Sequence, residues 1–184
     1  MKKNTYGIQN GLLNRSLFKA SPNRSVRPKL NDIRLIVIHN ISLPPEQFNN
    51  HHIDDFFLNQ LDPNAHPYFE KICHLQVSAH LLIRRDGTIT QFVPFDERAW
   101  HAGVSTFNGT ENCNDFSIGI ELEGTDQLAY TDEQYLALSR CCRSLIEKYP
   151  LITTDNIVGH SDIAPGRKTD PGESFDWEKF RTLL

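Results

Sequence analysis

The 184-residue sequence has no long apolar run, and near its start the longest such stretches are pairs such as Leu12–Leu13 and Leu17–Phe18. A membrane-spanning helix needs about 20 predominantly apolar residues, and a secretory signal peptide needs an apolar core of about 7 to 15. Neither pattern occurs. We therefore expect a protein that neither spans a membrane nor is exported, and that works in the cytoplasm.

The sequence also lacks clusters of lysine and arginine, and its formal net charge is -4. Because nucleic acids and anionic membranes bind basic clusters, neither is expected as a partner, and no obligate protein partner is evident. The four cysteines, Cys73, Cys113, Cys141 and Cys142, do not show C-x-x-C spacing. Adjacent cysteines in a helical segment cannot easily bridge to each other, so reduced thiols are expected, as in cytosolic proteins.

Length and a hydrophobic content of 39% suit one compact domain, assigned to residues 32–184, with residues 1–31 as an N-terminal extension that the sequence does not explain. Asp86–Gly87 supplies the turn of one hairpin. Strands are predicted at residues 33–39, 79–83, 88–93, 116–123 and 156–160, and helices near residues 53–57, 131–149 and 177–184. Strands alternating with helices favour an α/β fold with a mixed central β-sheet flanked by helices.

Two histidines follow hydrophobic strands far apart in the sequence, His39 after residues 33–38 and His160 after residues 156–159. Side chains at strand ends often meet in one crevice at the edge of a sheet. Taken alone, however, His39 is more readily explained as a structural histidine. The loop of residues 159–172, rich in glycine, proline and aspartate, changes that balance because its two ends carry His160 and Asp170.

His39, His160 and Asp170 would give three nitrogen or oxygen ligands and leave a fourth tetrahedral position open, which is typical of catalytic zinc. On its own, Asp170 could instead be a turn-forming carboxylate before Pro171, and Lys168 a solvated surface charge. In an extended segment, however, Lys168 and Asp170 would point to the same side and place a cation beside the metal.

Four segments together resemble the zinc-dependent N-acetylmuramoyl-L-alanine amidases: residues 37–40, 99–103, 114–124 and 159–172. The similarity runs from about residue 33 to residue 177. Within the family it is greatest to the members that act on cytosolic 1,6-anhydromuropeptides in peptidoglycan recycling. The resemblance implies an amidase or peptidoglycan-recognition-like fold, and hydrolysis of the bond between the lactyl group of 1,6-anhydro-N-acetylmuramic acid and L-alanine.

The resemblance also implies roles for individual residues. One Zn²⁺ per chain would be held by His39, His160 and Asp170, with Glu121 as catalytic acid and base and Lys168 as the residue that stabilises the transition state. The implied substrate-binding residues are Asn40, Tyr68, Leu122 and Ala164. Strand 116–123 alternates, so Glu123 shares the face of Glu121 and is its rival; the family motif favours Glu121.

One departure from the family concerns the peptide stem of the substrate. Where arginines are expected to grip this acidic peptide, the sequence has Gln76 and Asn112, which cannot form a charge-assisted pair. Arg84, Arg98 or Arg167 could compensate. Trp100 and His101, in the segment 99–103, could border the sugar or support the metal.

Three other functions compete with a recycling amidase. A wall-lytic amidase would use the same chemistry on polymeric peptidoglycan, although the lack of an export signal disfavours it. A peptidoglycan-recognition module would bind without cleaving, but all of the implied ligands and both catalytic residues are present. A structural zinc site is disfavoured because three ligands leave the metal open and no cysteine set completes it.

Overall fold

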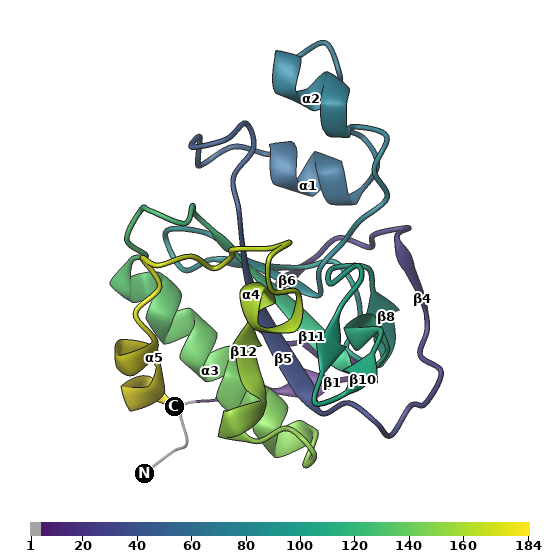
Figure 1. Ribbon diagram of the computed structural model, residues 1–184, viewed down its shortest axis with the longest axis vertical. Helices are drawn as coiled ribbons and strands as arrows, with labels where there is room; N and C mark the ends of the chain where they lie inside the picture. Colours follow the sequence, from purple (N-terminus) through teal and green to yellow (C-terminus); the bar gives the residue numbers. More distant parts are fainter. Residues whose placement is uncertain (1–4) are drawn as a thin grey trace.

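A six-stranded mixed β-sheet forms the centre of the computed structural model, which describes residues 5–184 (Figure 1). Its strand order is β12-β5-β11-β6-β7-β3. The strands are β3 (Leu17–Phe18), β5 (Leu35–Ile41), β6 (Leu81–Ile83), β7 (Ile89–Gln91), β11 (Ser117–Glu123) and β12 (Ile157–Gly159). Neighbours pair in parallel except β6 and β7, which form the predicted hairpin with Gly87 at φ +81° in its turn. The predicted mixed α/β sheet is confirmed.

Helices cover both faces of this sheet. The helical segments are α1 (His52–Phe57), α2 (Pro67–Ile72), α3 (Asp132–Lys148), α4 (His160–Ile163) and α5 (Trp177–Leu183), with 3-10 turns η1 (Cys113–Asp115) and η2 (Thr154–Asn156). Helices α3 and α5 pack their apolar side chains against one face, whereas α1 and its surroundings pack against the other. In Figure 1, α1 and α2 form a lobe at the top of the molecule. None of the helices in residues 5–184 combines the length and apolar character needed to cross a membrane.

Helix α3 begins at the capping box that its sequence predicts. The Thr131 hydroxyl accepts a hydrogen bond from the Gln134 amide, and the Gln134 side chain accepts one from the Thr131 amide, both at 3.1 Å. These bonds satisfy two amides that the first helical turn leaves free. Helix α2, by contrast, was not among the predicted helices.

Strand β11 alternates between two faces as predicted, with Glu121 and Glu123 on the same one. Both faces are buried. Glu121 is only 9% exposed, and Glu123 is fully buried. A parallel neighbour on each side and helices or loops over both faces leave no solvent-facing side to this strand.

The segment before residue 32 packs against the domain. It contains β1 (Ile8–Gln9) paired with β2 (Leu12–Leu13), the edge strand β3, and β4 (Arg24–Val26) paired with β8 (Glu97–Ala99). A further small hairpin joins β9 (Thr106–Phe107) and β10 (Thr110–Glu111). Residues 1–4 of the predicted extension lie outside the described residues, and the domain boundary at residue 32 stays a prediction.

Arg27 ties this segment to the centre of the protein. Its guanidinium, 2% exposed, donates to the carbonyl oxygens of Phe95, Asn114, Asp115 and Ser117 at 2.8 to 3.2 Å. Burial lowers the pKa of Arg27 to about 10, which still leaves it cationic at neutral pH. Four carbonyl groups far from water therefore depend on one side chain for their hydrogen bonds.

We predict that Arg27→Met lowers the free energy of unfolding by about 2 to 4 kcal/mol, because several buried carbonyls lose their donor. Arg24→Met, in the strand β4 that directly precedes Arg27, is the control. Its half-exposed ion pair with Glu97 should contribute only about 0 to 1 kcal/mol. Denaturant unfolding measures both, and equal losses in the two variants would contradict the anchoring role of Arg27.

Candidate metal centre

Three adjacent parallel strands bring the predicted site residues together. His39 lies near the carboxyl end of β5, and Glu121 on β11 is its direct partner in the sheet register. His160 follows β12, which pairs with the opposite edge of β5. Asp170 lies on the loop after α4. A hydrogen bond from the Ser161 amide to the Asp170 carbonyl fixes the position of this loop.

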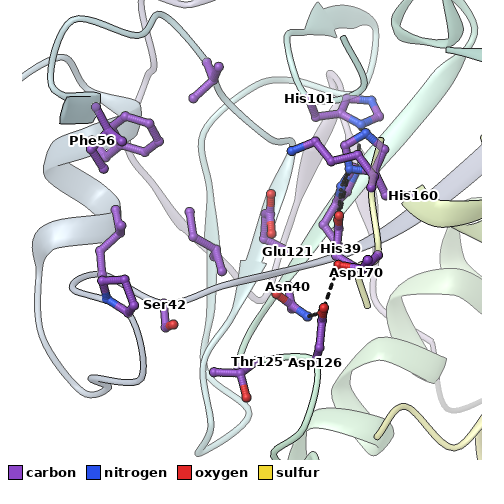
Figure 2. Close-up of a pocket in the computed structure, with 18 of the residues that line it drawn as sticks. His39, Asn40, Ser42, Phe56, His101, Glu121, Thr125, Asp126, His160 and Asp170 are labelled. Atoms are coloured by element: carbon purple, nitrogen blue, oxygen red, sulfur yellow. Dashed lines mark hydrogen bonds and ion pairs between the residues drawn. The ribbon is translucent and has the colours of Figure 1, made fainter. Parts of the chain in front are cut away.

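Three ligand atoms converge at this point (Figure 2). The Nδ1 atoms of His39 and His160 lie 3.0 Å apart, and each lies 3.0 Å from Oδ2 of Asp170. Both histidines are buried, and Asp170 is mostly buried. Among residues 5–184, this is the buried group of histidine, cysteine and carboxylate side chains with the spacing to hold a metal ion. The other such group, His51, His52 and Asp55, lies towards the surface on α1.

The hydrogen bonds around the cluster test whether a metal fits it. Nε2 of His160 lies 3.0 Å from the carbonyl oxygen of Ala102, which can only accept, so Nε2 carries the proton and Nδ1 is a bare lone pair. That lone pair faces the Asp170 carboxylate, a second acceptor, with no donor between them. A cation among these atoms resolves the repulsion, so the donor set fits a divalent metal of the type bound by histidine and carboxylate.

The protonation of the cluster also suits metal binding. Burial lowers the pKa of His39 to about 4, so its imidazole is neutral at physiological pH. Burial alone would raise the pKa of Asp170, but its contacts with the imidazoles of His160 and His39 outweigh that effect and lower it below the usual range. Neutral imidazoles and an ionised carboxylate are the forms that bind a metal.

Glu121 and Glu123 have different surroundings although they share one face of β11. Oε2 of Glu121 is buried without a hydrogen-bond partner, and it faces the pocket that contains the cluster. Burial, reinforced by the charge of Asp170 and opposed by Lys168, raises the pKa of Glu121 well above its ordinary value. Glu123 instead accepts from the amides of Asn49 and Arg85 and pairs with Arg84. Glu121 is therefore the carboxylate available for chemistry.

The pocket of about 580 Å³ has two unlike sides. The metal cluster, Glu121 and Lys168 line one side, and apolar residues of the α1–α2 lobe line the other. Figure 2 shows Phe56 and Ser42 across the pocket from His39 and Asp170.

The four predicted substrate-binding residues are placed differently. Asn40 and Tyr68 line the pocket, whereas Leu122 and Ala164 are buried and do not line it. Their role in substrate binding stays a prediction.

The structure adds a residue that the sequence did not indicate, Asp126. Its carboxylate accepts from the Asn40 side-chain amide at 2.8 Å and from the Thr169 hydroxyl at 2.6 Å. These two donors are the chain neighbours of the ligands His39 and Asp170. Asp126 therefore holds β5 and the ligand loop together beside the cluster. The sequence did not indicate this role, because an aspartate in the segment 124–127 is typical of an ordinary turn.

The residues considered for contact with the peptide stem differ in whether they line the pocket. Gln76 and Asn112 are exposed and do not line the pocket. Arg84 pairs with Asp54 and Glu123, and Arg98 pairs with Asp115. Of the three candidate arginines, Arg167 lines the pocket, where it donates to the carbonyl oxygens of Ala102 and Val104.

Comparisons of sequence and structure relate the chain to known proteins. A family model described as N-acetylmuramoyl-L-alanine amidase matches residues 29–173. The chain is 61% identical over 164 residues to the 1,6-anhydro-N-acetylmuramyl-L-alanine amidase AmpD of Citrobacter freundii, covering 89% of this chain and 87% of that protein. A crystal structure of AmpD superposes with a TM-score of 0.94 at 57% identity, covering 97% of this chain and 99% of the other.

A second solved structure carries a substrate. It is the N-acetylmuramyl-L-alanine amidase AmiD from Escherichia coli in complex with anhydro-N-acetylmuramic acid-L-Ala-D-γ-Glu-L-Lys. The TM-score is 0.62 at 32% identity, with 83% of this chain and 57% of that chain covered.

We predict that Glu121→Gln stabilises the metal-free protein at pH 8 but much less at pH 5. A carboxyl group whose pKa is raised by folding contributes stability at low pH and loses it as the pH rises through the folded-state pKa. Removing the charge should therefore gain on the order of 1 kcal/mol at the higher pH. Denaturant unfolding in the presence of a chelator measures this difference.

Glu123→Gln is the matched control on the same face of β11. It weakens the ion pair with Arg84 and should destabilise the fold. A gain from Glu121→Gln that is the same at both pH values would show that Glu121 is not a buried, strained carboxylate.

Proposed function

The chain belongs to the N-acetylmuramoyl-L-alanine amidase family, and we propose that it acts on soluble muropeptides that carry 1,6-anhydro-N-acetylmuramic acid. It hydrolyses the amide bond between the lactyl group of the sugar and L-alanine. Its likeness to AmpD over most of both chains supports the anhydro form of the substrate. The observation that carries the proposal is the buried, unpartnered carboxylate of Glu121 beside three converging ligand atoms in an open pocket.

We assign one zinc ion per chain to His39, His160 and Asp170. When bound there, the ion would supply a Lewis acid that polarises the scissile carbonyl and makes water more acidic. The lone pairs of the two Nδ1 atoms and the carboxylate form the three-ligand set typical of catalytic rather than structural zinc.

Glu121 is the general base and then the general acid. Its raised pKa brings it nearer to neutral pH, where a carboxyl group can both take a proton from the attacking water and return it to the departing amine of L-alanine. The partnerless Oε2 atom is free to hold that proton. Because the group is already desolvated in the folded protein, no hydrogen bond has to break before it reacts.

Lys168 stabilises the negative charge that develops on the carbonyl oxygen. Its ammonium group lines the same pocket, and its charge lowers the pKa of both Glu121 and His39. A cation beside the reacting carbonyl favours the transition state over the ground state.

Arg167 is our candidate for contact with the acidic peptide stem. It lines the pocket on a guanidinium anchored by two backbone carbonyls, whereas Gln76 and Asn112 are neutral and lie outside. A single arginine gives one charge-assisted contact. We therefore infer weaker discrimination for the peptide than for the sugar and the scissile bond. Asn40, Tyr68, Leu122 and Ala164 remain the proposed substrate-binding residues.

We propose that the protein works in the cytoplasm. All four cysteines are free, and Cys113, Cys141 and Cys142 are buried as small apolar residues. Unpaired thiols are usual in a reducing compartment, where soluble muropeptides would be recycled. Fractionation of cells that make the tagged full-length protein tests this location.

The polymer-cleaving and recognition-only alternatives are separated by a substrate assay. We predict that the native enzyme releases peptide from anhydromuramyl tripeptide, that a chelator abolishes release, and that zinc restores it. Mass spectrometry of the products measures each step, with intact wall polymer as the comparison substrate. Preference for polymer would make it a wall-lytic enzyme, and no cleavage of either would favour a recognition module.

A pair of variants separates the carboxylate from the metal. We predict that Glu121→Ala keeps its zinc affinity but loses about 10² to 10⁴ of kcat, as expected for a lost general base. Asp170→Ala should lose at least about tenfold in zinc affinity, because it removes a ligand atom. Zinc titration and turnover measure the two effects. Full activity in Glu121→Ala, or unchanged zinc affinity in Asp170→Ala, would refute the corresponding role.

A further inference from the structure

His101 lies behind the metal cluster and touches the ligand His39 from the far side. Its Nδ1 atom is 2.8 Å from Nε2 of His39, and its own Nε2 atom is 3.0 Å from the hydroxyl of Ser117. The two imidazole rings meet edge to face, with centroids 5.0 Å apart. Figure 2 shows the His101 ring next to the cluster on the side away from Asp126. Both ring nitrogens of His101 are thus occupied, so neither is free to act as a further ligand.

The sheet is built to make room for this ring. Gly119 sits in the middle of β11, where a side chain at its Cβ position would come within 2.4 to 2.7 Å of three His101 ring atoms. Glycine in a strand interior is unfavourable unless something approaches the backbone closely. The His101 ring is what approaches here, so the glycine and the histidine explain each other.

The protons of this chain of hydrogen bonds can be placed by elimination. To bind a metal through Nδ1, His39 must carry its proton on Nε2, and that buried N–H needs an acceptor. The acceptor within reach is Nδ1 of His101. His101 must then carry its proton on Nε2, which can donate to the Ser117 hydroxyl. The opposite arrangement would protonate Nδ1 of His39, which faces the cluster, and would block the ligand.

We propose that His101, backed by Ser117, is a positioning residue that holds His39 in the tautomer able to bind the metal. The inference rests on the metal site of the proposed function. His160 has an equivalent acceptor in the Ala102 carbonyl. The adjacent residues His101 and Ala102 therefore orient both histidine ligands, and this gives a physical form to the expectation that the segment 99–103 supports the metal.

The neighbours of His101 hold its ring in place. Nδ1 of His80 accepts from the Gly119 amide, and Nε2 of His80 lies 3.1 Å from the Glu97 carbonyl oxygen and 3.0 Å from Nη2 of Arg27. Arg27 also donates to the carbonyl of Ser117, the residue whose hydroxyl meets His101. These contacts fix the strand beside the ring, and Nδ1 of His101 lies against Nε2 of His39.

The test compares two replacements of His101 in the full-length protein. His101→Phe keeps a ring but removes the acceptor, whereas His101→Asn can place an amide oxygen where Nδ1 lies. We expect zinc affinity, measured by competition with a chelating dye, to fall about 10- to 100-fold in His101→Phe. It should return to within about threefold of wild type in His101→Asn. His74→Phe, at an exposed histidine that does not line the pocket, is the control and should bind zinc normally.

Two further readouts separate positioning from general damage. The unfolding temperature of each metal-free variant should stay near wild type, and ¹⁵N NMR of the zinc-loaded wild type should show the His39 proton on Nε2. The proposal is overturned if His101→Phe binds zinc as wild type does, if both variants lose affinity together with stability, or if His39 carries its proton on Nδ1. If the wild type itself binds no zinc, the proposed function fails instead.

Discussion

The site depends on three possible ligand atoms held 3.0 Å from one another, two of them at the carboxyl ends of neighbouring strands and one on the loop that carries Asp170. Such an arrangement is repulsive without a cation, so the rest of the fold must hold it in place. The parallel register of β5 with β11 and β12 supplies the positions of His39 and His160. The hydrogen bonds that Asp126 accepts from Asn40 and Thr169 hold the ligand loop against β5. The rigid sheet therefore stabilises a site that would otherwise relax.

The same reasoning explains why two glutamates on one face of one strand differ so much. Glu123 accepts hydrogen bonds from Asn49, Arg84 and Arg85, and these bonds offset the free-energy cost of burying its charge. Glu121 has no such partner for Oε2, and its burial is uncompensated. An uncompensated buried carboxylate lowers the stability of the fold, and a raised pKa is the direct result. Groups of this kind concentrate at functional sites, where the desolvation that lowers stability also makes the group more reactive.

Much of this was accessible from sequence wherever a pattern is local. The β-branched run before His39, the capping box of α3 and the Asp86–Gly87 hairpin each occupy a few consecutive residues, and each is confirmed. The order of the strands is not local, so the pairing of β12 with β5 could not be predicted from either strand alone. The pairing of buried Glu123 with Arg84 could not be predicted for the same reason, because the two residues lie 39 positions apart in the chain. Likewise, the burial of Leu122 and Ala164 away from the pocket is a tertiary property that a motif match does not contain.

The N-terminal segment packs as part of the folded protein although most of it lies outside the residues that the family model matches. The family match begins at residue 29, yet Arg27 donates a hydrogen bond to the carbonyl of Ser117 on β11. The Ser117 hydroxyl contacts His101, and His101 contacts His39, so three successive polar contacts join this segment to the metal cluster. Each contact is buried or partly buried, where hydrogen bonds are strong and a missing partner is costly. A substitution at residue 27 therefore removes a donor from the backbone of Ser117, the residue whose hydroxyl contacts the His101 ring behind His39.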